Sequence, residues 1–347
     1  MKLASIISAF AFAIPQLTFA QLSDFDDWEH ERIQLDDVSI HFRYHGQGPP
    51  VLLVHGFPQH SLTWHTIGPI LAQNCMSSHI FGNERVNYTV IAPDIRGCGD
   101  SSIPTSKNYT AAAAGADLKA ILDYLNISST YVFAHDKGVG LATSLAIEHP
   151  SLVKAIILAE YALPGYGYPL TVQSPSLYQN WQLAFFAVPD AAEFFIRDRE
   201  RQMLSWYFFH ASYSGMAAVS EDHLQRYTNG IAKPGFLRSG MEYFAAAWDD
   251  EAYFTSVFGS GHRLQMPLLA LGGEASFGPV SLLEQVWSQI GDYFVAELIP
   301  KAGHWIGDEN PIWTGNRALR FFEEAGEVSS VDLSYLKDQV TLQGGTI

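Results

Sequence analysis

The stretch that decides the fold is Tyr131-Val132-Phe133-Ala134-His135-Asp136-Lys137-Gly138-Val139-Gly140. Its first four residues predict a short buried strand, and the small residues that begin at Gly138 predict a helix after a tight turn. The turn has the layout of a nucleophile elbow, in which small residues flank one side chain that a strained backbone holds above a sheet. Asp136 occupies the position where serine is usual. A carboxylate there attacks carbon and forms an alkyl ester with its substrate.

Buried apolar strands alternate with helices on both sides of this elbow, and a segment at 30–44 alternates polar and apolar residues, which predicts an antiparallel edge pair. Strict alternation favours an α/β fold whose sheet is mainly parallel. The predicted strands beyond the edge pair are 51–54, 89–93, 131–134, 153–159, 267–271 and 294–299. The predicted helices are 61–73, 111–125, 138–149, 282–290 and 313–324.

The alternation stops between residues 163 and 263, where the chain is helical, rich in aromatic residues and without a clear buried strand. We therefore predict a helical cap at 163–263, inserted into an α/β core made of 21–162 and 264–330. The segment after Gly326 is predicted to lie loosely on the surface, with a C-terminal tail at 331–347.

Residues 1–20, MKLASIISAFAFAIPQLTFA, have the features of a secretory signal peptide. Lys2 gives the positive end, an apolar run follows, and small residues near Ala20 form a cleavage site. The alternative, a membrane anchor, fits less well because the run is short and Pro15 interrupts it. We expect a secreted, extracellular protein that begins at Gln21 and has no membrane segment in its mature form.

In a secreted protein, N-glycosylation sequons can be glycosylated and cysteines can form disulfides. The sequons begin at Asn87, Asn108 and Asn126. Cys75 and Cys98 are the two cysteines, and they form either one disulfide or two free thiols. The formal net charge of −16 argues against nucleic acid and anionic membranes as partners. The sequence leaves the oligomeric state open.

Four motifs occur in order along the chain: His55-Gly56-Phe57-Pro58-Gln59, Asp94-x-Arg96-Gly97-x-Gly99-x-Ser101, His135-Asp136-x-Gly138 and Gly303-His304-Trp305. Together they resemble the α/β-hydrolase superfamily, in particular the branch of epoxide hydrolases and haloalkane or haloacetate dehalogenases. The resemblance covers about 30–325. It implies an eight-stranded, mostly parallel sheet flanked by helices, with an inserted helical cap.

The resemblance also implies a triad. Asp136 is expected to be the nucleophile, although an Asp at such a turn can also serve only as a helix N-cap. His304, after the last strand, is expected to activate water. Glu160, directly after strand 153–159, is expected to orient His304. Glu274 is the alternative acid, because the second acid site of the family falls in Gly273-Glu274-Ala275-Ser276 and has Ser where Asp is usual.

The backbone N–H groups of Phe57 and Lys137 occupy the oxyanion-hole positions of the family. Pro58 fixes the first of these loops and is a candidate for a cis bond. His55, Gly56 and His135 belong to the motifs, and we expect the two histidines to make structural hydrogen bonds.

Epoxide opening needs a proton donor, which related enzymes place in the cap as Tyr or His. The two corresponding positions hold Gln182 and Phe244, and Tyr243 lies one residue early. One residue on a helix turns a side chain by about 100°, so Tyr243 either faces the site or packs within the cap. Other tyrosines that qualify are Tyr178, Tyr207 and Tyr213.

We therefore expect an epoxide hydrolase that acts on a small apolar molecule without a cofactor or metal. Hydrolytic dehalogenation is the first alternative, although Lys137 and Phe57 replace the Trp and Asn typical of haloalkane dehalogenases, and no arginine lies near Gly140 on the elbow helix. A repurposed, non-catalytic binder of a small apolar molecule is the second alternative, suggested by the altered cap positions.

Overall fold

The computed structural model describes residues 22–73, 86–169 and 177–338. The predicted signal peptide and Cys75 lie outside these ranges. Eight strands form one sheet in the order β1-β2-β4-β3-β5-β6-β7-β8. Their bounds are β1 Glu29–Gln34, β2 Ser39–His45, β3 Pro50–Val54, β4 Thr89–Pro93, β5 Thr130–His135, β6 Val153–Ala159, β7 Leu268–Gly273 and β8 Phe294–Ile299.

The sheet confirms the predicted fold class. β1 and β2 pair antiparallel at one edge, and β2 also runs antiparallel to β4. All remaining neighbours are parallel, and fully buried β3 and β5 lie side by side in the middle. Parallel strands of this kind are covered on both faces, which explains why their sequences are continuously apolar.

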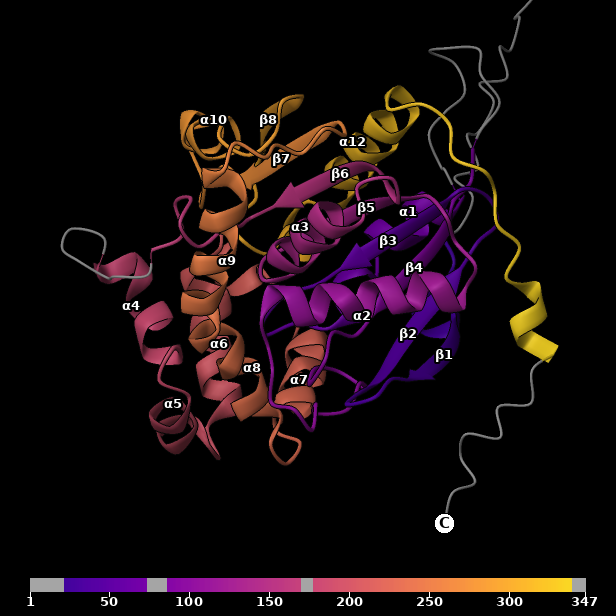
Figure 1. Cartoon of the computed structure of the whole chain (residues 1–347). Helices are drawn as coiled ribbons and strands as arrows, with labels where there is room; N and C mark the ends of the chain where they lie inside the picture. Colours follow the sequence, from indigo (N-terminus) through magenta and orange to yellow (C-terminus); the bar gives the residue numbers. More distant parts are fainter. Residues whose placement is uncertain (1–21, 74–85, 170–176, 339–347) are drawn as a thin grey trace, which may run out of the picture.

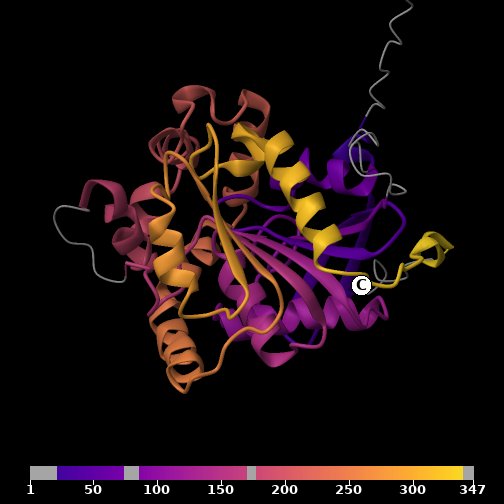
Figure 2. The same ribbon diagram turned by 90° about the horizontal axis from the view of Figure 1, so that it is seen from above.

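Two helical layers cover the sheet (Figures 1 and 2). α2 (Ala111–Tyr124) and α3 (Gly138–Glu148) pack on one face, while α1 (Ile67–Gln73) and α12 (Pro311–Glu324) pack on the other. Alternation along β3 separates the two cores, because Leu52 and Val54 join the first and Val51 and Leu53 join the second. The remaining short elements are α10 Ser281–Trp287, α11 Ile306–Glu309, and the 3-10 turns η1 Phe25–Asp27, η2 Ser61–Trp64, η3 Gly215–Ala217 and η4 Ser334–Asp338.

Helices fill the chain between β6 and β7 and lie to one side of the sheet (Figure 1). They are α4 Leu177–Phe186, α5 Pro189–Ile196, α6 Glu200–His210, α7 Glu221–Ile231, α8 Phe236–Ala245 and α9 Ala247–Gly259. Phe254 and Phe258 of α9 pack into the core beside α2 and α3. Asp250 of α9 also accepts a 2.7 Å hydrogen bond from the backbone N–H of Ala111. The range predicted as cap therefore includes one helix that flanks the sheet.

The segment after Gly326 is not loose as far as it is described. Val331 forms an antiparallel bridge with Gly48, and Leu333 and Leu336 are buried against the core. The prediction was wrong here because three separated apolar residues do not form a periodic pattern, yet each meets apolar surface left by the main sheet.

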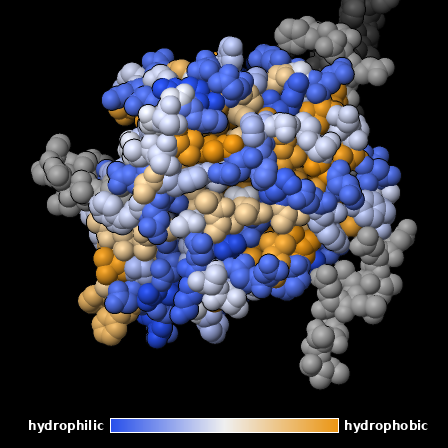
Figure 3. All heavy atoms as spheres, in the orientation of Figure 1, coloured by the Kyte–Doolittle hydropathy of each residue, from blue (hydrophilic) through white to orange (hydrophobic). Residues whose placement is uncertain are grey.

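Several surface features concern the predicted glycosylation sites, the cysteines and the absence of a membrane segment. The side chains of Asn87, Asn108 and Asn126 are exposed, and Cys98 is a free thiol. Among the described residues, no helix combines the length and the hydrophobicity needed to span a bilayer. Figure 3 shows apolar atoms at the surface over α5, where Phe194 and Phe195 are 78% and 60% exposed.

Candidate active site

The elbow between β5 and α3 holds Asp136 in a backbone conformation that favours glycine, with φ of 50°. The turn is tight: a Cβ atom at Gly138 would lie 2.5 Å from the carbonyl oxygen of Val54. Such strain is typical of sites where the backbone must present one side chain. Oδ1 of Asp136 accepts a 2.8 Å hydrogen bond from the backbone N–H of Phe57. This contact leaves Oδ2 of Asp136 to face a side-chain partner.

That partner is His304, in the loop after β8. Its Nε2 lies 3.4 Å from Oδ2 of Asp136, and its Nδ1 lies 2.9 Å from Oε2 of Glu160. Glu160 directly follows β6 with a positive φ of 61°, and its side chain is fully buried. The structure thus brings the three predicted triad residues into one line, at the carboxyl ends of strands β5, β6 and β8.

The two candidate acids lie in different places. Glu274 is exposed and accepts a 2.9 Å hydrogen bond from the backbone N–H of Lys301, whereas Glu160 contacts His304. The other oxygen of Glu160 accepts from the backbone N–H of Gly273 and from the Ser276 hydroxyl at 2.7 Å. Ser276, where the family often has Asp, therefore supports the acid supplied by β6.

The triad charges depend on one another. Burial disfavours ionisation of Asp136, but its hydrogen bond and charge interaction with His304 outweigh burial and lower the pKa of Asp136. Burial also disfavours the charged form of His304, yet hydrogen bonds with Asp136 and Glu160 raise its pKa. Before any reaction, the arrangement therefore favours a carboxylate at Asp136 and an imidazolium at His304.

The motif residues position this site. His55 donates from Nδ1 to the carbonyl of Gly56 at 2.9 Å, and its Nε2 accepts from the N–H of Ile95 at 3.0 Å. His135 donates from Nε2 to the carbonyl of His304 at 2.7 Å. Both histidines make structural hydrogen bonds, as expected.

The predicted oxyanion positions lie beside Asp136. The Phe57–Pro58 peptide is cis, and the N–H of Phe57 donates to Oδ1 of Asp136. Lys137 is the N-cap residue of α3, so its backbone N–H belongs to the unpaired donors at the start of a helix. A Cβ atom at Gly56 would lie 2.2 Å from Oδ1 of Asp136, which explains the glycine there.

A cavity of ≈ 270 Å³ opens above Asp136 between the core and the cap. Its volume suits a small ligand. The wall combines aromatic, apolar and hydrogen-bonding groups. The lining residues are Asp136, Lys137, Glu160, Tyr161, Ala162, Gly167, Tyr168, Pro169, Asn180, Gln182, Leu183, Tyr207, His210, Ala211, Phe244, Ala275, Ser276, Phe277 and His304.

The side chain of Lys137 enters this cavity, which sequence reasoning missed by assigning only its backbone N–H. Nζ donates to the hydroxyl of Tyr168 at 3.0 Å and to that of Tyr161 at 3.4 Å. It also lies 4.1 Å from the centre of the Phe244 ring. Burial lowers the pKa of Lys137 to about 8, although the charges of Asp136 and Asp250 act in the opposite direction. The available signal was a lysine next to Asp136 in the sequence, but the direction of its side chain depended on the fold.

The predicted cap donors have different positions. Tyr243 does not line the cavity and donates a 3.0 Å hydrogen bond to the carbonyl of Arg96, so of the two orientations left open for Tyr243 the structure has the one that faces away from the site. Gln182 and Tyr207 do line the cavity. Tyr213 is exposed and does not line it, and the side chain of Tyr178 lies outside the described residues.

The fold agrees with that of known proteins. The family model of the α/β hydrolase fold matches residues 49–311, and the chain therefore belongs to that family. Its relatives place it in the branch of epoxide hydrolases, as predicted.

Three similarities illustrate this placement. A soluble epoxide hydrolase of Corynebacterium sp. (strain C12) is 24% identical over 299 residues, which cover 84% of this chain and 96% of the relative. A fluoroacetate dehalogenase of Burkholderia sp. is 26% identical over 311 residues, covering 87% and 96%. The crystal structure of Cfl2 from Burkholderia cenocepacia matches with a TM-score of 0.74 and 27% identity, covering 84% of this chain and 95% of that one.

Proposed function

We propose that this hydrolase opens epoxides to diols through a covalent ester on Asp136. The observation that carries the proposal is the line from Asp136 through His304 to Glu160, at the floor of a cavity that fits a small molecule. The similarity to epoxide hydrolases supports the choice of substrate class.

In the first step, Oδ2 of Asp136 attacks an epoxide carbon. A carbon–oxygen bond forms to Asp136, the epoxide carbon–oxygen bond breaks, and the departing oxygen takes a proton. Oδ1 remains bonded to the N–H of Phe57. The low pKa of Asp136 keeps the nucleophile ionised at neutral pH.

In the second step, water attacks the ester carbonyl. Esterification removes the negative charge of Asp136, which is one of the two carboxylates that raise the pKa of His304. His304 therefore releases its proton to solvent more readily, and the neutral imidazole takes a proton from the attacking water while Glu160 stabilises the resulting imidazolium. The N–H groups of Phe57 and Lys137 hold the oxyanion. Its collapse breaks the bond to the substrate oxygen, which takes the proton from the His304 imidazolium and leaves as the diol. Ionisation of the Asp136 carboxyl then releases the second proton of the water, and His304 takes a proton back from solvent.

The proton donor of the first step is, in this proposal, the ammonium group of Lys137. The expected cap positions do not supply an acid, since Phe244 has no ionisable group and the Gln182 amide does not release a proton. Lys137 is nearly buried within the cavity and contacts two tyrosine hydroxyls there. A pKa of about 8 lies close to neutral pH, where a general acid is most effective. The proton released when the ester is hydrolysed returns Lys137 to its charged form.

A single turnover in ¹⁸O-labelled water tests the covalent step. With styrene oxide as probe, the proposal expects the label in the carboxylate of Asp136 after turnover, detected by mass spectrometry of the peptide. In His304→Gln, the same peptide is expected to gain the mass of the intact epoxide because the ester persists. Asp136→Asn is the matched control and should gain neither. A label found only in the diol would contradict the covalent mechanism.

The donor is tested by the rate of ester formation in the His304→Gln background. Lys137→Arg keeps the charge but cannot release a proton, so both Lys137→Arg and Lys137→Met should slow ester formation by about 100-fold or more. In the parent, the rate should fall as the pH rises through about 8. Ester formation that is as fast in Lys137→Met as in the parent would remove Lys137 as donor and leave the ester mechanism intact.

Dehalogenation of a haloacid is the second candidate, favoured by the buried ammonium of Lys137 and by the dehalogenase relative. An ammonium in the cavity can pair with a substrate carboxylate. Fluoride release from fluoroacetate, measured with an ion-selective electrode, distinguishes it from diol formation.

Secretion and glycosylation are further parts of the proposal. They are supported by the signal-peptide pattern of residues 1–20 and by the exposed side chains of Asn87, Asn108 and Asn126. Protein from a eukaryotic culture should be found in the medium, begin at Gln21 and lose mass after endoglycosidase treatment. An intracellular chain that keeps its first 20 residues would contradict this.

A further inference from the structure

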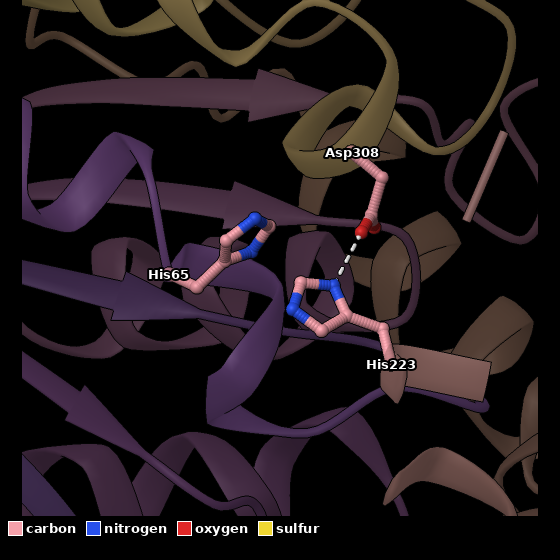
Figure 4. Close-up of side chains that lie close together, drawn as sticks. All are labelled: His65, His223 and Asp308. Atoms are coloured by element: carbon pink, nitrogen blue, oxygen red, sulfur yellow. Dashed lines mark hydrogen bonds and ion pairs between the residues drawn. The ribbon is translucent and has the colours of Figure 1, made fainter. Parts of the chain in front are cut away.

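Three metal-ligating side chains meet where the cap rests on the core, outside the catalytic cavity (Figure 4). His65 directly follows η2, His223 is on the cap helix α7, and Asp308 is on α11. One ligand atom from each side chain lies within 4.8 Å of the others. The three residues are far apart in the sequence, so only the tertiary fold assembles them.

Their spacing is close to that of a metal site. Nδ1 of His223 lies 3.0 Å from Oδ1 of Asp308, and the rings of His65 and His223 meet edge to face with centroids 4.2 Å apart. Two ligands that are each about 2.0–2.1 Å from a tetrahedral zinc ion lie about 3.3 Å from each other. His223 and Asp308 are already near this separation. The ligand atom of His65 lies within 4.8 Å of both, so a side-chain movement of at most about 1.5 Å brings it to the same separation.

Neighbouring groups orient the ligands in the way that outer-shell partners of metal sites do. Nδ1 of His65 lies 3.1 Å from the carbonyl oxygen of Leu62, which can only accept, so Nδ1 carries the proton and Nε2 has a free lone pair. Oδ2 of Asp308 accepts a 3.0 Å hydrogen bond from the side-chain amide of Gln59. That bond leaves Oδ1 directed at His223.

The local charges permit a cation. The side chain of Asp308 is only 4% exposed, and the chain as a whole has a net charge of −16. Arg226, one turn after His223 on α7, is the cation in the immediate surroundings that would oppose metal binding. Its guanidinium donates to both carboxylate oxygens of Asp26, at 3.0 and 2.6 Å, which compensates its charge.

We propose that His65, His223 and Asp308 bind one divalent transition-metal ion, with Zn²⁺ the best match to two imidazoles and a carboxylate. Water would complete four-coordination. Because His223 belongs to the cap and the other two ligands to the core, the ion would fasten α7 to the core. Gln59, which donates to Asp308, would connect the metal site to the loop whose Phe57 N–H donates to Asp136. The site does not depend on the proposed reaction.

The test uses the untagged mature chain after removal of metals with EDTA. Zn²⁺ in excess of its Kd is expected to raise the Tm by about 2 °C or more, because it binds only the folded state. One equivalent of Co²⁺ should give the visible absorption bands of a four-coordinate ion. Both signals are measured against each protein in its metal-free form.

Variants assign the site. His65→Asn, His223→Asn and Asp308→Asn should each weaken Co²⁺ binding at least tenfold, while His262→Asn, at an exposed histidine after α9, should bind as the parent does. Each shift is compared with that variant's own metal-free Tm, so a loss of basal stability does not mask the result. The proposal would be overturned if the parent showed neither the rise in Tm with Zn²⁺ nor the Co²⁺ absorption bands. It would also be overturned if both signals persisted in His65→Asn and in His223→Asn.

Discussion

Replacing Lys137 by methionine is expected to stabilise the fold, because the residue is a buried cation. Its pKa falls from 10.5 to about 8 on burial, which corresponds to about 3 kcal/mol, since each pKa unit is worth about 1.4 kcal/mol. Methionine of similar size removes this cost. It also removes the hydrogen bonds that Lys137 donates to Tyr161 and Tyr168, each worth about 0.5–1.5 kcal/mol. The expected net gain at pH 7 is therefore about 0–2 kcal/mol, or up to roughly 5 °C in Tm.

The dependence of this gain on pH is the sharper test. Below pH 8, Lys137 is charged in both the folded and the unfolded chain, so the parent bears the full cost. Between about pH 8 and 10.5 the folded state has lost the proton while the unfolded state still binds it, so the stability of the parent rises by about 1.4 kcal/mol per pH unit. The advantage of Lys137→Met should therefore be greatest at pH 7 and vanish by about pH 9.5. At pH 10.5 the variant should be less stable than the parent by about 1–3 kcal/mol, because only the two lost hydrogen bonds then count.

The assay is urea unfolding of Lys137→Met and the parent at several pH values from 7 to 10.5, followed by tryptophan fluorescence. Lys233→Met is the matched control, because the Lys233 ammonium is 40% exposed and pairs with Asp100 at the surface. The stability difference for that variant should change little with pH. A Lys137→Met protein that is less stable than the parent at pH 7, or whose advantage does not change with pH, would refute the reasoning about burial.

Three further changes separate the roles of residues around Asp136. Gly56→Ala should fold but slow ester formation by about 100-fold or more, since its Cβ would lie 2.2 Å from Oδ1 of Asp136; normal single-turnover rates would contradict this. Glu160→Gln should affect ester hydrolysis more than ester formation, by about 10² or more, so that mass spectrometry finds accumulated ester at steady state. If the ester does not accumulate, Glu160 does not act through His304. Tyr243→Phe should keep turnover within about threefold and lose about 1 kcal/mol of stability with its hydrogen bond to Arg96, and a large loss of turnover would return Tyr243 to the donor role.

The active site was predictable to different degrees. Asp136 and His304 were found from motifs, because Asp136 directly follows β5 and His304 lies in the loop after β8, and the fold places the ends of these strands at one edge of the sheet. The choice between Glu160 and Glu274 needed coordinates, since both follow parallel strands. The packing of Ser276 and Gly273 against Glu160 distinguishes them.

The direction of side chains in the cap could not be predicted from the sequence. Tyr243 and Phe244 are neighbours on α8, and helix rotation sends the first to Arg96 and the second over Lys137. A one-residue alignment difference thus decides which group faces the cavity, and the phase of a helix is fixed only by its contacts with other elements.

The sequence by itself determined the order of strands and helices, the elbow at Asp136 and the family, because these depend on local periodicity and on short motifs. Only the tertiary structure decided where the ammonium of Lys137 lies, that the segment from Val331 to Leu336 packs on the core, and that His65, His223 and Asp308 converge. Those outcomes depend on contacts between segments separated by tens to hundreds of residues. Such contacts follow from how the whole chain fills space, and no local pattern records them.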